Sequence, residues 1–355
     1  MRADTVTENN NDSQDQATNA PAASTQSLRS SWISFYRKNG RALNAFITFL
    51  LVWGVCAANN PTLFFNPIFY NSFLFSVPAT IFLTTSLVFV IVSGELDLAF
   101  PSVVGAAGGV FMYLVVLDID VVLAFMLTML FGAMIGLCIG SIVVYGKISS
   151  LVATLGLNFF ILGIVNLLAQ GRTISAPDAM NSFGYELFVG KWKFFGSNLQ
   201  VPSHFLWSLV WVGFCYILFN RHRFGIRVQM VGDNADSARQ MGINVERIRV
   251  GVFIFSGVAA AITGALLVQM ANMVWFPTSG KAYLLIALAA LFVGGTPTWG
   301  GVGSIIGAFF GALTITLIPS GAVGAGFAGY WTDFIFGFVI ILTMIAHRFS
   351  GARVR

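Results

Sequence analysis

The sequence predicts an all-α, polytopic membrane protein with about ten membrane-spanning helices. Of its 355 residues, 57% are hydrophobic and only 9% are charged, whereas soluble domains carry about 25% charged residues. The apolar residues form long unbroken runs, which excludes a β-barrel because barrel strands alternate in polarity over about ten residues. A spanning helix needs about 20 apolar residues, so the composition allows about ten spans and little soluble structure.

The N-terminal segment precedes the spans. Residues 1–31 are rich in Asn, Gln, Ser, Thr and Ala and show no apolar period, so we expect a disordered polar tail. Aromatic side chains followed by two basic ones lie between residues 31 and 39, which is typical of a segment at the membrane interface. Residues 32–355 are predicted to form a single transmembrane domain.

Five apolar runs fill the first half of that domain. Each is long enough to cross a bilayer as a helix, and Pro78 near the start of the second and Pro101 in the third predict local irregularity. A polar stretch at 170–203 follows them. The runs lie at about 42–58, 70–92, 99–117, 121–145 and 151–169.

Five further runs follow the polar stretch, and a basic loop at 221–249 separates the first two of them. The eighth span overall is short. In the ninth, Gly303, Gly307 and Gly311 are four residues apart, a spacing that lets helix backbones approach closely. These runs lie at about 204–220, 250–272, 282–293, 302–318 and 327–346.

The basic residues test this count and give the orientation. With ten spans and the N-terminus in the cytoplasm, only four of the 19 Lys and Arg residues lie outside, namely Arg172, Lys191, Lys193 and Lys281. Cytoplasmic loops of membrane proteins carry such an excess, so both termini are predicted to be cytoplasmic. The net charge of +5 therefore indicates membrane orientation, and no nucleic-acid partner is expected.

The sequence contains no catalytic or metal-binding pattern. Cys56, Cys138 and Cys215 have no metal-ligand spacing, so no metal is expected. The segment 184–191 is no phosphate loop, because Trp192 stands where a magnesium-binding Ser or Thr would be. Few carboxylates lie within the spans, and Asp333 is near an end of the tenth, which argues against an ion-driven carrier. We expect no enzyme activity and no cofactor in this chain.

The basic loop at 221–249 carries a short helix signal. Asp233 or Asn234 can cap a helix over 235–241, and Gly242 can end it in a left-handed conformation. Such a compact helical knob on the cytoplasmic side is suited to docking. A docked partner would supply the energy source that the chain lacks.

Three phrases carry a resemblance to the membrane subunits of the ABC importers for ribose and related sugars. The first is Ser93-Gly94-Glu95-Leu96-Asp97-Leu98-Ala99, the second runs from Gly232 to Val245, and the third includes Gly294-Gly295-Thr296-Pro297 and Gly300-Gly301-Val302-Gly303. The resemblance assigns Ser93, Gly94, Asp97, Gly294 and Gly295 to a helix junction. It assigns a role in coupling to an ATPase to Asp233, Asn234, Ala235, Ala238, Arg239 and Gly242.

The resemblance implies a ten-helix permease subunit in the bacterial inner membrane. Its partners would be cytoplasmic ABC ATPase subunits, which bind ATP and Mg²⁺, a periplasmic solute-binding protein, and a second permease copy in a homo- or heterodimer. Glu95 and Pro101 depart from the family phrase, and residues 283–287 lack its usual acidic side chains. A branched-chain amino-acid ABC permease and a stand-alone secondary carrier or facilitator remain alternatives, and an intramembrane enzyme would lack any assembled catalytic group.

Neutral polar and aromatic residues in the spans are candidates for the lining of a pathway for a small solute. Sugar hydroxyls hydrogen-bond to amides, and sugar C–H faces stack on rings. Each residue could instead pack or hydrogen-bond between helices. The candidates are Asn158, Asn166, Gln269, Asn272 and Trp275.

Overall fold

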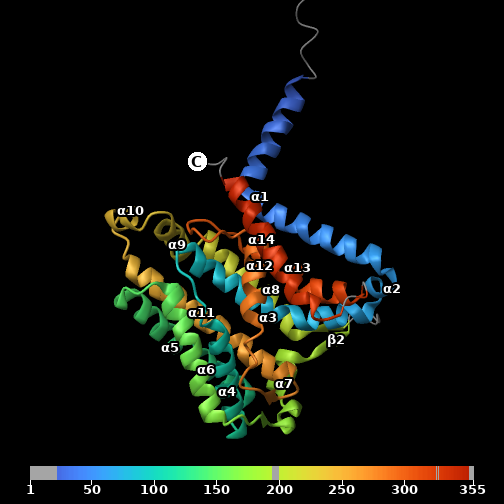
Figure 1. Ribbon diagram of the computed structural model, residues 1–355, viewed down its shortest axis with the longest axis vertical. Helices are drawn as coiled ribbons and strands as arrows, with labels where there is room; N and C mark the ends of the chain where they lie inside the picture. The colour runs from blue at the N-terminus through green and yellow to red at the C-terminus, as the bar shows by residue number, and fades with distance from the viewer. Residues whose placement is uncertain (1–21, 194–199, 325, 327, 352–355) are drawn as a thin grey trace, which may run out of the picture.

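The computed structural model describes residues 22–193, 200–324, 326 and 328–351, and in this part of the chain helices predominate (Figure 1). The helices are α1 (Ala22–Asn59), α2 (Pro61–Phe64), α3 (Pro67–Val92), α4 (Phe100–Val116), α5 (Val121–Gly146), α6 (Ser150–Ala169), the 3-10 helix η1 (Pro177–Asn181), α7 (Phe183–Val189), α8 (Ser203–Asn220), α9 (Arg223–Asp233), α10 (Ala235–Gln240), α11 (Val245–Met270), α12 (Tyr283–Val293), α13 (Ile305–Gly324) and α14 (Trp331–Gly351). Two antiparallel pairs of short strands complete the fold, β1 (Ile174–Ser175) with β4 (Val274–Trp275) and β2 (Lys191–Lys193) with β3 (Gln200–Pro202).

The prediction of an all-α, polytopic membrane protein is confirmed. Each of the ten expected apolar runs corresponds to a helix, and the ends differ by a few residues except at the start of α1, which begins twenty residues before the expected run. Seven of the described helices are long and apolar enough to cross a membrane, while α4, α12 and the apolar part of α14 are shorter.

The start of α1 differs from the expected tail. Residues 1–21 of that segment lie outside the described residues, whereas 22–31 form the first turns of α1, which continues to Asn59. Ala, Leu, Gln and Arg have high helix propensity, and Ala22, Ala23, Gln26 and Leu28 lie among these residues. The lack of an apolar period therefore did not exclude a helix there.

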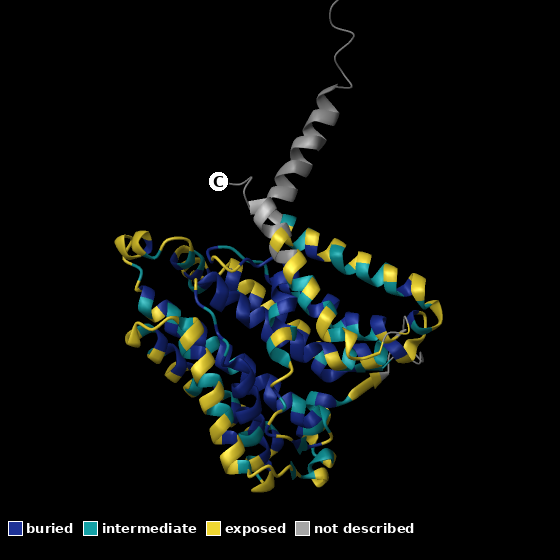
Figure 2. Ribbon diagram, in the orientation of Figure 1, coloured by how far each residue is buried: buried dark blue, intermediate teal, exposed yellow. Residues whose placement is uncertain are grey.

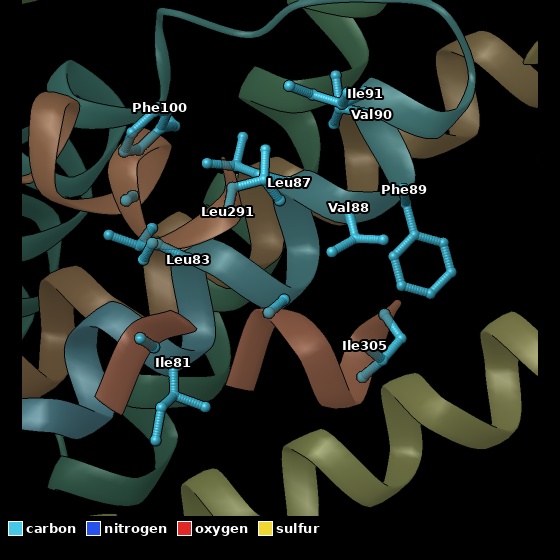
Figure 3. Close-up of a cluster of buried hydrophobic side chains, with 14 of the residues drawn as sticks. Ile81, Leu83, Leu87, Val88, Phe89, Val90, Ile91, Phe100, Leu291 and Ile305 are labelled. Carbon is cyan, nitrogen blue, oxygen red and sulfur yellow. The ribbon is translucent and has the colours of Figure 1, made fainter. Parts of the chain in front are cut away.

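The core is built around α3 and α11. In α3, 89% of the most apolar window is buried, and in α11 72%, whereas in α6 only 11% is buried. Figure 2 shows the same gradient, with dark central helices and exposed residues along α5 and α6. Figure 3 shows α3 side chains from Ile81 to Ile91 packed with Phe100, Leu291 and Ile305. The outer helices thus leave apolar faces for lipid or for another chain.

Glycines bring the backbones of α5 and α11 into direct contact. A Cβ atom at Gly136 would overlap the Phe253 carbonyl group and lie 2.8 Å from the Ile254 Cα atom. A Cβ atom at Gly257 would lie 3.0 Å from the backbone of Gly136. Small residues at helix interfaces allow such close approach in membranes. The two helices therefore pack along shared backbone surfaces, without intervening side chains at these points.

Candidate functional site

The short helix α10 forms as the sequence predicts. Asn234 is its N-cap, and the Asn234 Oδ1 atom accepts the backbone N–H groups of Asp236 at 3.0 Å and Ser237 at 2.9 Å. Asp233, the other cap candidate, is the last residue of α9. Gly242 follows the helix with a φ of +78°, a conformation that disfavours a Cβ atom. Figure 1 places α9 and α10 at one edge of the molecule, at the upper left.

Helix α10 is fastened to the start of α11. The Arg239 guanidinium binds Asp236 Oδ1 at 3.0 Å within α10 and Glu246 Oε1 at 2.9 Å on α11. These hydrogen-bonded carboxylates, Glu246 first, raise the pKa of Arg239. Within α10, Ala238 is fully buried, and Ala235 is partly buried and packs against the hydrophobic core. The remaining side chains of α10 are exposed, so the helix presents a polar outer face on a fixed base.

The three phrases that carry the family resemblance meet in space. The Gly301 N–H donates to the Val92 carbonyl oxygen at 2.8 Å, at the end of α3. A Cβ atom at Gly232 would overlap that same carbonyl oxygen and lie 2.7 Å from the Gly301 nitrogen. A Cβ atom at Gly300 would lie 3.0 Å from the Gly232 carbonyl oxygen and 3.2 Å from the Gly94 Cα atom. We call this meeting point of residues 92–94, 232–233 and 300–301 the glycine junction.

The other predicted junction residues lie in or beside these turns. Ser93 is buried and donates its hydroxyl to the Val90 carbonyl oxygen at 2.7 Å. Gly294 ends α12, and a Cβ atom there would lie 2.7 Å from the Ala308 Cα atom on α13. Gly295 lies against Arg41 of α1. Gly294 thus holds α12 close to α13.

Asp97 is buried between α4 and α11. Its Oδ1 atom accepts the Ala99 N–H at 2.8 Å, and its Oδ2 atom accepts the Ser256 hydroxyl at 2.7 Å. Burial raises the pKa of Asp97, and these hydrogen bonds offset only part of that effect. Two residues earlier, Glu95 forms an ion pair with Arg249, with 3.1 Å between Oε1 and Nε. Sequence reasoning missed Ser256 and Arg249, although their spacing of seven places them on one face of a helix.

The pathway candidates differ in their exposure. Gln269 is fully buried on α11 with an Oε1 atom that has no hydrogen-bond partner among the described residues. Trp275 is also buried and donates to the Gly105 carbonyl oxygen. Asn166 and Asn272 are exposed, and Asn158 is half-buried. Their role in lining a pathway stays a prediction.

A cavity of about 270 Å³ lies elsewhere, beside the start of α3. Its walls are Asn71, Ser72, Phe75, Lys191, Gln200 and Pro202. The Gln200 N–H donates to Asn71 Oδ1 at 2.7 Å, which ties the β2–β3 pair to α3. None of the pathway candidates lines it. Within the described residues, no three or more His, Cys, Asp and Glu side chains form a group that could hold a metal ion.

Comparison with known proteins identifies a family and several relatives. The sequence profile of the family described as the branched-chain amino acid transport system permease component matches residues 69–344. The ribose import permease protein of Haemophilus influenzae is 27% identical, over 87% of this chain and 94% of its own length. The autoinducer 2 import system permease protein of Photorhabdus luminescens is 27% identical over 87% and 90%. The xylose transport system permease protein of Escherichia coli is 28% identical over 74% and 80%. No solved structure matches the chain.

Proposed function

The chain belongs to the family of branched-chain amino acid transport system permease components, where it resembles the ribose-type sugar permeases, and from this premise we propose its function. It is the membrane-spanning permease subunit of an ATP-driven importer for a sugar or a related small polar solute. The observation that carries the proposal is the meeting of the three family phrases at the glycine junction, directly beside the capped helix α10.

The proposed topology has ten spans, with both termini in the cytoplasm of a bacterium and the chain in its inner membrane. Contacts between turns support it. The end of α3, residue 232 and residues 300–301 touch one another, so they share one side of the membrane. The β1–β4 pairing joins residues 174–175 to 274–275, which the topology puts together on the other side. The excess of basic residues near α9 and α10 favours the cytoplasm for the first side.

The proposed energy source is a pair of cytoplasmic ABC ATPase subunits, which bind ATP and Mg²⁺. Helix α10 and its flanking residues supply the docking element, through Asp233, Asn234, Ala235, Arg239 and Gly242, whereas Ala238 is fully buried and supports the helix from within. Its exposed polar face is free for contact, while Ala238 and the Arg239–Glu246 pair fix its position against α11. Movement of the ATPase would thereby be passed to a helix of the membrane core.

On the opposite face, a periplasmic solute-binding protein would deliver the solute to a dimer of permeases. The largely exposed α6 carries Asn158 and Asn166, so it is available to face a second copy or a shared pathway. The printed names of the relatives give ribose, xylose and autoinducer 2 as their solutes. These names support a sugar-like solute for this chain.

The test is transport in proteoliposomes that contain the chain, its ATPase subunit and its binding protein. Radiolabelled D-ribose and D-xylose are the probes. We expect concentrative uptake of one of them with ATP and none with a non-hydrolysable ATP analogue. Concentrative uptake by the chain alone, driven by a proton or sodium gradient, would overturn the importer proposal in favour of a secondary carrier.

A branched-chain amino acid is the second candidate solute. The family description names that class, and Tyr283-Leu284-Leu285-Ile286-Ala287 contains no acidic side chain. Radiolabelled L-leucine in the same proteoliposomes separates the two candidates. ATP-dependent uptake of leucine without uptake of either pentose would favour the amino acid.

A further inference from the structure

The segment that joins α3 to α4, residues 93–99, is attached to α11 by two acidic side chains. Asp97 Oδ2 accepts the Ser256 hydroxyl at 2.7 Å, and Glu95 Oε1 lies 3.1 Å from Arg249 Nε. Residues 95 and 97 are two positions apart, and in an extended segment side chains at this spacing point to the same side. Positions 249 and 256 are two helical turns apart on one face of α11. The two contacts are therefore side by side.

The backbone of the same segment is attached to α6. The Leu96 N–H donates to Ser150 Oγ at 3.1 Å, and the Leu98 N–H donates to Thr154 Oγ1 at 3.0 Å. The Thr154 hydroxyl lies 3.3 Å from the Leu96 carbonyl oxygen. Ser150 and Thr154 are one turn apart on α6, so they face the segment together. Residues 95 and 97 thus contact α11 through their side chains, and residues 96 and 98 hydrogen-bond to α6 through their backbone N–H groups.

The attachment is continuous with the docking helix. Arg239 of α10 binds Glu246 at the start of α11, three residues before Arg249. Gly94, the second residue of the segment, touches Gly300 in the glycine junction. Asp97 is only 4% exposed and Thr154 is fully buried, so water does not compete for the hydrogen bonds of these two side chains, whereas the Arg239–Glu246 pair is partly exposed. A short bonded route therefore runs from α10 through α11 and residues 95–98 to α6.

We propose that Glu95 and Asp97 are positioning residues that couple the movement of α10 and α11 to α6 during the transport cycle. The proposal rests on the proposed function, because the movement is the one that a docked ATPase would impose. Glu95 replaces a small residue of the family phrase, and its pairing with Arg249 gives this chain a second attachment beside Asp97. The coupling acts through position and touches no solute.

The test follows the two ends of the route separately in the complete complex. In a variant free of Cys56, Cys138 and Cys215, spin labels are attached at Met241 beside α10 or at Leu168 on α6, each paired with a reference label at Val323 on α13. All three labelled side chains are exposed. Electron-electron distances are measured without nucleotide and with ATP trapped by vanadate. The substitution Ser256→Ala removes the hydroxyl that Asp97 accepts.

We expect both distances to change on ATP trapping in the unsubstituted complex. With Ser256→Ala the Met241 distance should still change, while the change at Leu168 should fall to less than half. Thr154→Val, which removes the Thr154 part of the α6 attachment with little change of volume and leaves the Ser150 bond in place, should give the same result. Ser86→Ala is the matched control, since this equally buried hydroxyl bonds only within α3.

Unchanged responses at both labels in Ser256→Ala and Thr154→Val would overturn the proposal while leaving the proposed function intact. No response at either label in the unsubstituted complex would overturn the proposed function itself, and this inference with it. The two failures are therefore distinguishable. Loss of both responses in Ser86→Ala would also overturn the proposal, because it would show that any lost buried hydroxyl blocks the movement.

Discussion

The indole N–H of Trp275 donates a 2.8 Å hydrogen bond to the backbone carbonyl oxygen of Gly105. The ring lies against α4 at glycines, since a Cβ atom at Gly109 would be 2.8 Å from the Trp275 Cζ2 atom. This contact fastens the strand pair β1–β4 to the membrane core. Trp275 was predicted as a pathway candidate, and the structure shows in addition that it has a packing role.

Trp275→Phe should lower stability. Phenylalanine keeps most of the buried ring but removes the hydrogen bond to the Gly105 carbonyl oxygen, a net loss of about 0.5–1.5 kcal/mol. The unfolding temperature in detergent should fall by several degrees. Trp299→Phe, at an exposed position, is the control and should leave it unchanged. An equal effect at both positions would contradict the assigned hydrogen bond.

Gly242→Val should impair coupling between ATP hydrolysis and transport. At a φ of +78°, a side chain with a Cβ atom is unfavourable by roughly 1–2 kcal/mol, and a β-branched one is worse. The space around Gly242 is open, so the effect arises from the backbone alone. Solute-stimulated ATPase activity should fall in the reconstituted complex. Gly242→Asn should retain most of it, because Asn tolerates the left-handed conformation.

Gly232→Ala should destabilise the glycine junction. Its added methyl group would overlap the Val92 carbonyl oxygen and approach the Gly301 nitrogen, and both belong to backbone that cannot rotate away. Overpacking of this kind costs about 1–3 kcal/mol or more. Thermal unfolding of the purified protein measures this loss of stability. Gly213→Ala on α8, where no atom lies within 4 Å, should be neutral or stabilising.

The stability contributed by Asp97 should depend on pH. Burial raises its pKa in the folded state above the unfolded-state value. Its contribution is therefore complete below the unfolded-state pKa, about 3.9 for Asp, and is lost as the pH rises through the folded-state pKa. Asp97→Asn cannot ionise. The difference in unfolding temperature, wild type minus variant, should therefore decrease as the pH rises from 4 to 8. A difference that stays constant over this range would contradict the prediction.

The spans were predictable because a bilayer demands long apolar helices whatever their neighbours are. Helix α10 was predictable because its cap, Asn234, lies within three residues of the groups that it binds. The hydrogen-bond partner of Asp97 was not predictable, because Ser256 is 159 residues away in the sequence. Only the packing of α11 brings the two side chains together. Gln269 and Asn166 look alike in an apolar run, yet one is buried and the other exposed.

The contact of α5 with α11 at Gly132, Gly136 and Gly257 has a mechanical consequence. Side chains that interdigitate can change rotamer and let helices slide, but backbone pressed on backbone has no such freedom. Helices α5 and α11 therefore act as one stiff lever. The two helices are antiparallel, so the turn before α5 (residues 117–120) and the turn after α11 (residues 271–273) lie at the same end of this lever. A tilt of the lever must bend these turns, where Asp118, Asn272 and Met273 already have positive φ angles.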